Sequence, residues 1–168
     1  ASLARLEAEQ ALAAVIAWPQ DVTAAAAADA RVAEQVAKEK ALFAARREAL
    51  LGQTGLLRVQ HERVVQEREA LRAQIVQAGE SLRHQKAELE TNRNLLKDGF
   101  ISATRISQLE ATVADYGARF EERRSELARV EQRLIDNDLR IKTLEGEYRQ
   151  QASDQLKVTS SRLSEIQQ

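Results

Sequence analysis

The sequence contains no cysteine, a single proline among its 168 residues, and 4% aromatic residues. Without cysteine the chain can form neither disulfide bonds nor thiolate metal sites. Proteins contain on average about 5% proline, so loop signals are unusually sparse here. A compact globular core would also use more aromatic side chains. The composition therefore argues against an ordinary globular domain.

The sequence also lacks methionine and any long apolar run. A membrane-spanning helix needs about 20 apolar residues in succession, and no secretory signal peptide is visible. The chain starts inside a helical pattern without an initiating methionine. We therefore expect it to be a fragment of a larger protein, in which case the missing targeting signals carry no weight.

What the sequence does contain is typical of long helices. Alanine, leucine, glutamate, glutamine and arginine dominate, and these residues favour the helical state. No window alternates as a strand would, which predicts an all-α fold. The net charge is −1 with both signs interspersed, so the chain presents no field that would attract nucleic acid.

Two heptad ladders are arranged as mirror images about Gly99. Seam residues recur at alternating steps of three and four from Leu96 back to Leu57, and again from Ser102 to Ile141, and the numbers of mirror partners sum to 198. Heptads indicate a coiled coil, and the mirror predicts that its two helices are antiparallel and joined at Gly99. The predicted facing pairs are Leu89 with Leu109, Leu82 with Tyr116, Leu71 with Leu127, and Val64 with Leu134.

The residues around Gly99 have the chemistry of a tight reversal. Lys97 would lie in a last helical turn, where a cation suits the exposed carbonyls. Gly99 would end the helix in the left-handed conformation, and Phe100 could then contact Leu95. Ser102 would cap the next helix. The alternative is one continuous helix with a kink at the glycine.

Two large apolar residues, Phe100 and Ile101, lie in this turn. Ile101 and Ile106 have the spacing of a hydrophobic staple around an N-cap. A two-helix coil cannot cover Phe100 and Ile101 completely, and exposed apolar groups often mark docking surfaces. We therefore predict a partner-binding tip, with local capping alone as the competing explanation.

The expected architecture is a long antiparallel two-stranded coiled-coil hairpin with a short extra N-terminal helix, forming one module. Its predicted parts are a short helix at 2–17, an ascending arm at 22–97, a tip turn at 98–101 and a descending arm at 102–168. Trp18-Pro19 should end the first helix, and Asp21 or Thr23 should cap the next. Gly52 to Gly55 is predicted to stay helical, although two glycines leave a break open.

The descending ladder changes its step near the C-terminus. Its heptad spacing holds as far as Tyr148, after which an extra step of four is needed. Such an insertion locally relaxes the supercoil. The continuing seam is predicted at Ala152, Leu156, Thr159, Leu163 and Ile166.

Catalytic and metal-binding signals are weak. His61 and His84 are the only histidines, and they are 23 positions apart, which does not form a metal-binding pair on one helix face. The sequence contains no glycine-rich phosphate loop, and a two-helix coil supplies no concave pocket for catalysis. We therefore expect no enzyme activity, no metal and no cofactor.

The tip sequence reads Leu95-Leu96-Lys97-Asp98-Gly99-Phe100-Ile101-Ser102, followed by Arg105, Leu109 and Glu110. This run resembles the hairpin tip of haemolysin-secretion-type (HlyD-like) membrane fusion proteins, the periplasmic adaptors of type I secretion systems. Trp18-Pro19 between a short and a long helix looks like the branch that exports proteases and lipases. The resemblance spans essentially the whole chain. It implies a helical insert between two lipoyl half-domains, in a parent with a β-barrel domain and an inner-membrane anchor.

The resemblance also implies a trimeric outer-membrane channel of the TolC type as partner at the tip. Through the parent protein it implies an inner-membrane ABC transporter and further copies in a homo-oligomeric ring. Related efflux adaptors carry an arginine, a leucine four residues on, and a serine seven further. Leu95 and Ser102 match the last two positions, Thr91 occupies the first, and Arg93 lies two residues later on a different helix face. The candidate tip residues are Arg93, Leu95, Leu96, Gly99, Phe100, Ile101 and Ser102.

The second functional hypothesis is a cytoplasmic structural coiled coil that scaffolds or dimerises and has no specialised tip. Coiled-coil architecture by itself fits both hypotheses. Lipoyl-like β segments on both sides of the fragment would favour the adaptor.

Overall fold

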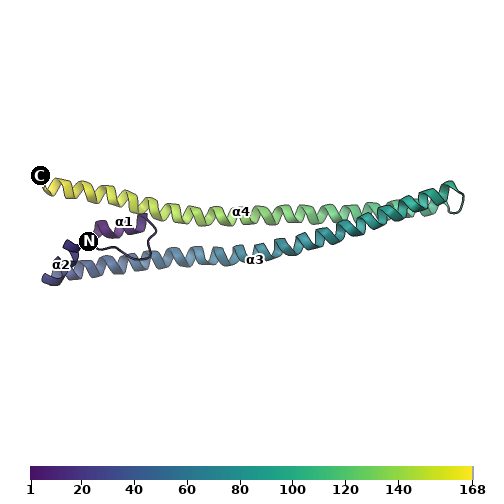
Figure 1. Cartoon of the computed structure of the whole chain (residues 1–168). Helices are drawn as coiled ribbons and strands as arrows, with labels where there is room; N and C mark the ends of the chain where they lie inside the picture. Colours follow the sequence, from purple (N-terminus) through teal and green to yellow (C-terminus); the bar gives the residue numbers. More distant parts are fainter. Residues whose placement is uncertain (168) are drawn as a thin grey trace. The chain divides into compact units, whose positions relative to one another are not determined.

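The computed structural model describes the backbone of residues 1–167 and the side chains of residues 1–165. Within that range the chain forms α1 (Ser2–Gln10), α2 (Gln20–Ala28), α3 (Ala30–Lys97) and α4 (Ala103–Gln167), and it contains no strand (Figure 1). The prediction of an all-α helical hairpin is confirmed.

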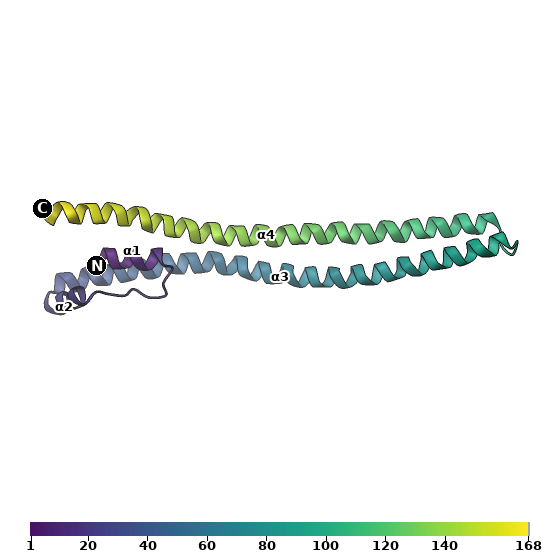
Figure 2. The same ribbon diagram turned by 45° about the horizontal axis from the view of Figure 1, so that its top comes forward.

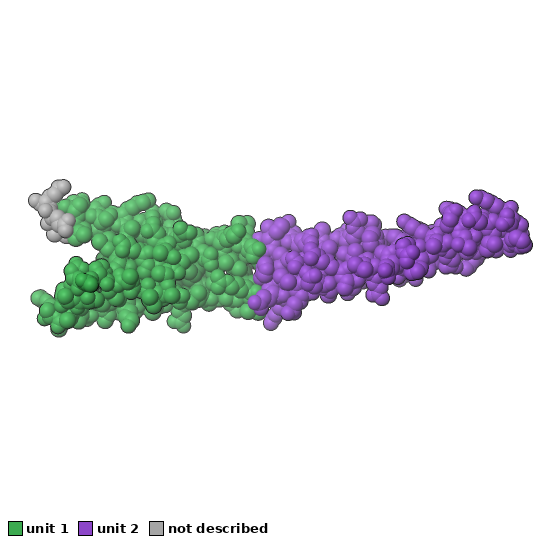
Figure 3. Space-filling view, viewed as in Figure 1, with its two compact units in different colours: residues 1–59, 137–168 green, residues 60–136 purple. Residues whose placement is uncertain are grey.

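The chain divides into two compact units, coloured separately in Figure 3. We call Gln60–Asp136 the tip unit, and Ala1–Val59 together with Asn137–Gln168 the terminal unit. In each unit a segment of α3 runs antiparallel to a segment of α4, as both ribbon views show (Figure 2). The terminal unit also contains α1 and α2.

The core of the tip unit consists of the predicted seam residues. One buried cluster brings together Val64, Leu71, Val130 and Leu134, with Leu127 packed against it, and a second contains Leu89, Ile106 and Leu109. These clusters agree with three of the predicted facing pairs. The pairing of Leu82 with Tyr116 stays a prediction, although a Cβ atom built on Gly79 would lie 3.2 Å from the Phe120 ring, in keeping with the same register.

Ion pairs between the two helices flank this seam. Arg133 lies 2.6 Å from Glu67, and Arg72 lies 3.2 Å from Glu131. All four side chains are about half exposed, and such pairs contribute about 0–1 kcal/mol each. The register of the tip unit is therefore set mainly by the apolar layers.

The first helix ends earlier than predicted, at Gln10 instead of residue 17. Leu12 adopts a left-handed backbone with φ of 52°, its N–H donates to the Glu9 carbonyl at 3.1 Å, and the Ala13 N–H donates to the Ala8 carbonyl at 2.8 Å. These two bonds form a Schellman stop. A leucine in this conformation costs roughly 1–2 kcal/mol, so other contacts must stabilise it.

Two arginines from the long helices provide these contacts. The Nε of Arg149 donates to the Gln10 carbonyl at 3.1 Å, and the Nε of Arg47 donates to the Ala13 carbonyl at 3.2 Å. Carbonyls at a helix end lack intrahelical partners, and a guanidinium is a strong donor to them. The end of α1 is thus determined by residues distant in the sequence, which explains why the prediction from local pattern was wrong.

The predicted ascending arm 22–97 is interrupted near its start. Asp29 has an extended backbone between α2 and α3, and its Oδ1 accepts a hydrogen bond from the Arg31 N–H at 2.8 Å. This is the geometry of an N-cap. The carboxylate of Asp29 competes with the helical conformation despite the preceding run of alanines.

The predicted caps of the second helix are not used as such. Pro19 occupies the N-cap position of α2, and Asp21 lies inside the first turn. The Thr23 hydroxyl donates to the Gln20 carbonyl at 2.8 Å, within the helix itself. The prediction of Asp21 or Thr23 as N-cap was therefore wrong, because the helix begins directly after Pro19, whose carbonyl accepts a hydrogen bond from the Thr23 N–H at 3.1 Å.

The glycine pair at 52 and 55 does not break α3, as predicted. Leu50 and Thr54 are buried on either side of Gly52, and the Thr54 hydroxyl donates to the Leu50 carbonyl at 2.9 Å. The seam therefore continues through this segment because its buried positions keep helical spacing.

The extra step in α4 is also visible in the burial pattern. Tyr148 and Ala152 are both buried, and Leu156 and Thr159 are half-buried. Leu163 is 43% exposed. The prediction for Ile166 lies outside the side chains that the structure describes. The shifted seam is thus visible from Ala152 to Thr159, as the sequence predicted, whereas the prediction that it continues at Leu163 was wrong.

A buried ionic network attaches α1 to α3. Arg5 contacts Glu39 at 2.6 Å and Glu9 at 2.7 Å, and Arg46 lies 3.3 Å from the same Glu9 carboxylate. Burial alone lowers the pKa of Arg5, but the hydrogen bonds to Glu39 and Glu9 outweigh it and raise the pKa above its ordinary value. Glu9 is fully buried, so losing both of its arginine partners would leave an uncompensated buried charge.

Tyr148 lies next to this network, and its hydroxyl has no hydrogen-bond partner in the described structure. Burial and the nearby Glu9 charge raise its pKa. We expect Tyr148→Phe to leave the free energy of unfolding at pH 7 unchanged or to raise it by up to about 1 kcal/mol, because a buried unsatisfied hydroxyl is removed. Urea unfolding measures this.

The same variant tests the pKa shift. Because the pKa of Tyr148 is raised in the folded state, its contribution to the free energy of unfolding stays constant below about pH 10, the pKa of tyrosine in the unfolded chain. That contribution falls as the pH rises through the folded-state pKa. The wild type should therefore lose more stability than Tyr148→Phe between pH 9 and 11. Tyr116→Phe, at the half-buried tyrosine of the tip unit, is the control. A loss above about 1 kcal/mol at pH 7 would contradict the unsatisfied hydroxyl.

Candidate partner-binding tip

The reversal at the end of α3 is a Schellman motif centred on Gly99. Gly99 has φ of +79°, its N–H donates to the Leu96 carbonyl at 3.0 Å, and the Phe100 N–H donates to the Leu95 carbonyl at 2.9 Å. These are the two bonds that define the motif. Lys97 lies in the last helical turn. The predicted left-handed stop at Gly99 is therefore confirmed.

The start of α4 is capped by Ser102, as predicted. The Ser102 carbonyl accepts a hydrogen bond from the Arg105 N–H at 3.1 Å, and its Oγ lies 3.3 Å from the same nitrogen. Ile101 packs against the buried cluster that contains Ile106, which is the predicted hydrophobic staple. Both sides of the turn are thus held by backbone hydrogen bonds and one apolar anchor.

These contacts leave most of the candidate tip residues at the surface. Phe100 is 76% exposed, while Ile101 is half-buried by its packing under the turn. The exposed members of the predicted set are Arg93, Leu95, Leu96, Gly99, Phe100 and Ser102. Ile101 is covered only in part, as predicted, because the staple packs its side chain against the cluster that contains Ile106.

Leu96 was also placed in the seam, facing Ser102. Leu96 is 36% exposed and Leu95 is 38% exposed. The last seam layer before the turn, formed by Leu96 and Ser102, is therefore partly exposed to solvent. The chain leaves α3 immediately after Lys97, and the small side chain of Ser102 covers little surface. Leucine and phenylalanine therefore form an apolar end around the turn.

Arg93 lies beside the tip and is held within the hairpin. Its guanidinium lies 2.8 Å from Glu110 of α4 and 3.8 Å from Glu90 of α3. Thr91, at the position where related adaptors carry arginine, donates its hydroxyl to the Ala87 carbonyl at 3.0 Å. The sequence reasoning missed Glu110 as the partner of Arg93, although charged residues that flank a coiled-coil seam often pair across it.

The groups gathered at the tip suit binding. Phe100 presents an apolar ring on a rigid backbone, and the Ser102 oxygens are engaged in capping. In the part of the chain that the structure describes, no three histidine, aspartate or glutamate side chains gather as metal ligands. Among the described helices, none has the length and apolarity of a membrane span.

A tight reversal between two long antiparallel helices, with an exposed aromatic residue at its end, defines an α-helical hairpin module. The chain belongs to the family described as "AprE, long alpha-helical hairpin", which matches residues 1–168. The resemblance seen in the sequence is thereby confirmed at the level of the family.

A solved structure gives a similar result. The chain is similar to the crystal structure of the soluble domain of LipC, described as a membrane fusion protein of a type I secretion system. The TM-score is 0.87 at 20% sequence identity, over 99% of this chain and 78% of that chain. At this identity the likeness shows the fold. A comparison with curated proteins gives no match.

Gly99 provides a test of the turn geometry. A Cβ atom on Gly99 would meet nothing within 4 Å, so Gly99→Ala should be destabilising through its backbone alone, by about 1 kcal/mol. Gly117→Ala, inside α4 with equally open space, should be stabilising by up to about 1 kcal/mol. Thermal and urea unfolding of both variants would measure the difference. Equal effects of the two substitutions would contradict the left-handed stop.

Arg93 and Glu110 provide a test of an internal role for Arg93. Their side chains are about half exposed, so Arg93→Glu should cost no more than about 1 kcal/mol of stability. The double exchange Arg93→Glu with Glu110→Arg should recover that loss and any accompanying loss of secretion. If the exchange restores stability but secretion stays impaired, Arg93 contacts a partner directly.

Proposed function

We propose that this chain is the periplasmic hairpin of a type I secretion adaptor whose tip docks to a trimeric outer-membrane exit channel. The parent protein is anchored in the inner membrane, carries the hairpin between lipoyl half-domains, associates with an ABC transporter and forms a homo-oligomeric ring. The hairpin acts as a spacer and a docking element, without catalysis.

The observation that carries this proposal is the exposure of Phe100 on a rigid turn. An aromatic ring that is 76% exposed would have lower free energy in contact with another apolar surface. Capping does not need this side chain, because the Schellman bond uses its N–H. Aromatic side chains on rigid supports are also frequent binding hot spots.

The family and the fold support the same function. The chain belongs to the AprE long α-helical hairpin family, and LipC, whose soluble domain has the same fold, is described as a membrane fusion protein of a type I secretion system. The spacing from Leu95 to Ser102 adds a local likeness to adaptor tips. Together these findings favour secretion over other uses of helical hairpins.

The competing function is a cytoplasmic scaffold or dimerisation module without a specialised tip. It would explain the seam and the capped turn equally well. It gives no reason for an exposed Phe100 held on a tightly capped turn, whereas the adaptor does. The two functions therefore differ in what they require of this one side chain.

Phe100→Asp in the full-length parent protein tests the proposal. The substitution should change the melting temperature by little, because Phe100 lies outside the buried clusters of the tip unit. We expect it to abolish export of the substrate and co-purification of the outer-membrane channel, since a charge would replace the apolar contact at the tip.

Val76→Asp is the matched control. Val76 is 66% exposed on α3 in the tip unit, so this variant introduces the same charge at a similarly exposed apolar position away from the turn. It should retain export and channel recruitment. If the double variant Phe100→Asp with Ser102→Ala still exports substrate and recruits the channel normally, the turn is only a structural cap. That result would favour the scaffold function.

A further inference from the structure

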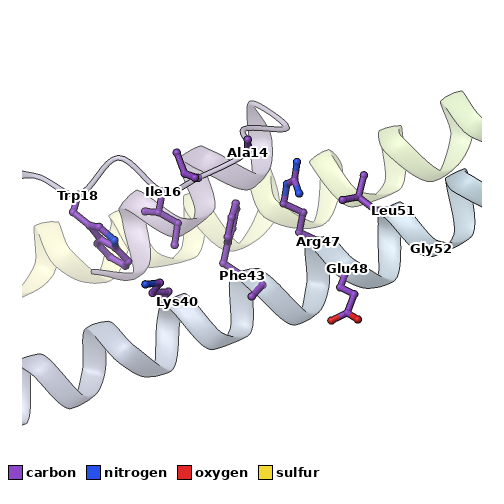
Figure 4. A pocket seen from close by; sticks show the side chains of 11 residues that line it. Ala14, Ile16, Trp18, Lys40, Phe43, Arg47, Glu48, Leu51 and Gly52 are labelled. Carbon is purple, nitrogen blue, oxygen red and sulfur yellow. The ribbon is translucent and has the colours of Figure 1, made fainter.

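A second candidate site lies in the terminal unit. The segment that follows α1 has no regular structure and runs along α3 with a groove of about 770 Å³ between them. Figure 4 shows Ile16 and Trp18 pointing from this segment toward α3, and Phe43 pointing back from α3. We call this the Trp18 groove.

The lining of the Trp18 groove is mainly apolar and partly open. Val15 is 73% exposed and Leu51 is 42% exposed, while Ile16 and Trp18 are half-buried and Phe43 is buried. Its volume falls within the roughly 300–1,000 Å³ of small-molecule sites. An apolar concavity of this size with a tryptophan in its wall offers considerable area to an apolar ligand.

Two cations lie at the edge of the groove. Lys40 is exposed, and none of the described residues forms an ion pair with it. Arg47 uses its Nε on the Ala13 carbonyl, and no described group accepts a hydrogen bond from its terminal nitrogens. Glu48 also lines the groove, and its carboxylate points away from the segment in Figure 4. The charges that face the apolar lining are therefore positive.

We propose that the Trp18 groove binds a single-chain anionic amphiphile of the fatty-acid class. The acyl chain lies against Ile16, Trp18 and Phe43, and the carboxylate contacts Lys40, which lies beside Trp18 in Figure 4. The apolar wall provides the free energy of binding in proportion to buried area. Lys40 selects a negative headgroup, and Arg47 adds positive charge toward the other end of the groove. Excess positive charge beside an apolar concavity is what favours this occupant over a second copy of the chain. The site is independent of the proposed function of the tip.

Titration of the 168-residue chain with dodecanoate, below its micelle concentration, tests the proposal. Trp18 is the only tryptophan in the sequence, so its fluorescence reports the groove directly. We expect a saturable change with one ligand per chain. Lengthening the acyl chain by two methylenes should tighten binding roughly tenfold, and dodecanol should bind more weakly than dodecanoate.

Variants separate the two parts of the site. Lys40→Gln should weaken dodecanoate binding about threefold to fivefold without changing dodecanol binding. Lys38→Gln on the same helix, where Lys38 pairs with Glu34 at 2.7 Å, should change neither. Val15→Asp should weaken the binding of both dodecanoate and dodecanol, because it places a carboxylate in the apolar wall of the groove. Circular dichroism checks that each variant stays folded.

Three results would overturn the proposal. The first is the absence of a saturable Trp18 signal with dodecanoate. The second is equal affinity of dodecanoate and dodecanol for the wild type. The third is a Trp18 signal that changes with protein concentration alone, together with dimer formation in sedimentation, because the occupant would then be a second copy of the chain.

Discussion

The tip unit depends on a single constraint: each helix has one apolar stripe, and each layer of that stripe has one facing partner. A two-helix coil has no third layer that could compensate for a mismatch. The reversal at Gly99 decides which layers meet, so that Leu89 packs near Leu109 and Val64 near Leu134. A change in turn length would shift every layer together, since both helices are continuous from this point.

The terminal unit is held together by different contacts. After Tyr148 the seam of α4 shifts by four residues, and α1 supplies additional packing in this unit, where Leu6 is almost fully buried. The contacts of α1 also include charges, with Arg5 and Glu9 both buried. Buried ion pairs contribute little net stability, but they strongly disfavour arrangements in which one partner is lost. The network therefore holds α1 in one position against α3.

The turn links the fold to the proposed function through one arrangement of the backbone. The bonds that stop α3 use the N–H groups of Gly99 and Phe100, and the staple uses the side chain of Ile101. Neither uses the ring of Phe100, which is left outside. The hydrogen bonds that end α3 thus also hold the backbone that presents this apolar side chain, an arrangement in which the proposed binding would lose little conformational entropy.

The features that the sequence predicted correctly are those that depend on local pattern. Heptad spacing determines which side of a helix is apolar, and glycine at position 99 permits a left-handed residue that other amino acids disfavour. For the same reason the continuity of α3 through Gly52 to Gly55 could be predicted, because the buried positions keep their helical spacing there. The exposed tip residues followed from the position of the turn.

What the tertiary structure decided are the features that depend on distant partners or on competing caps. The end of α1 at Gln10 depends on Arg149 and Arg47, which lie far along the chain. The ion pair of Arg93 depends on Glu110 of the opposite helix. Hydrogen bonds to the end of α1 leave no periodic signal in the sequence, and heptad spacing does not by itself specify which flanking charges pair. The sequence by itself therefore determined the hairpin and its turn, whereas the extent of α1 and the contacts of its charged side chains were determined when the helices packed together.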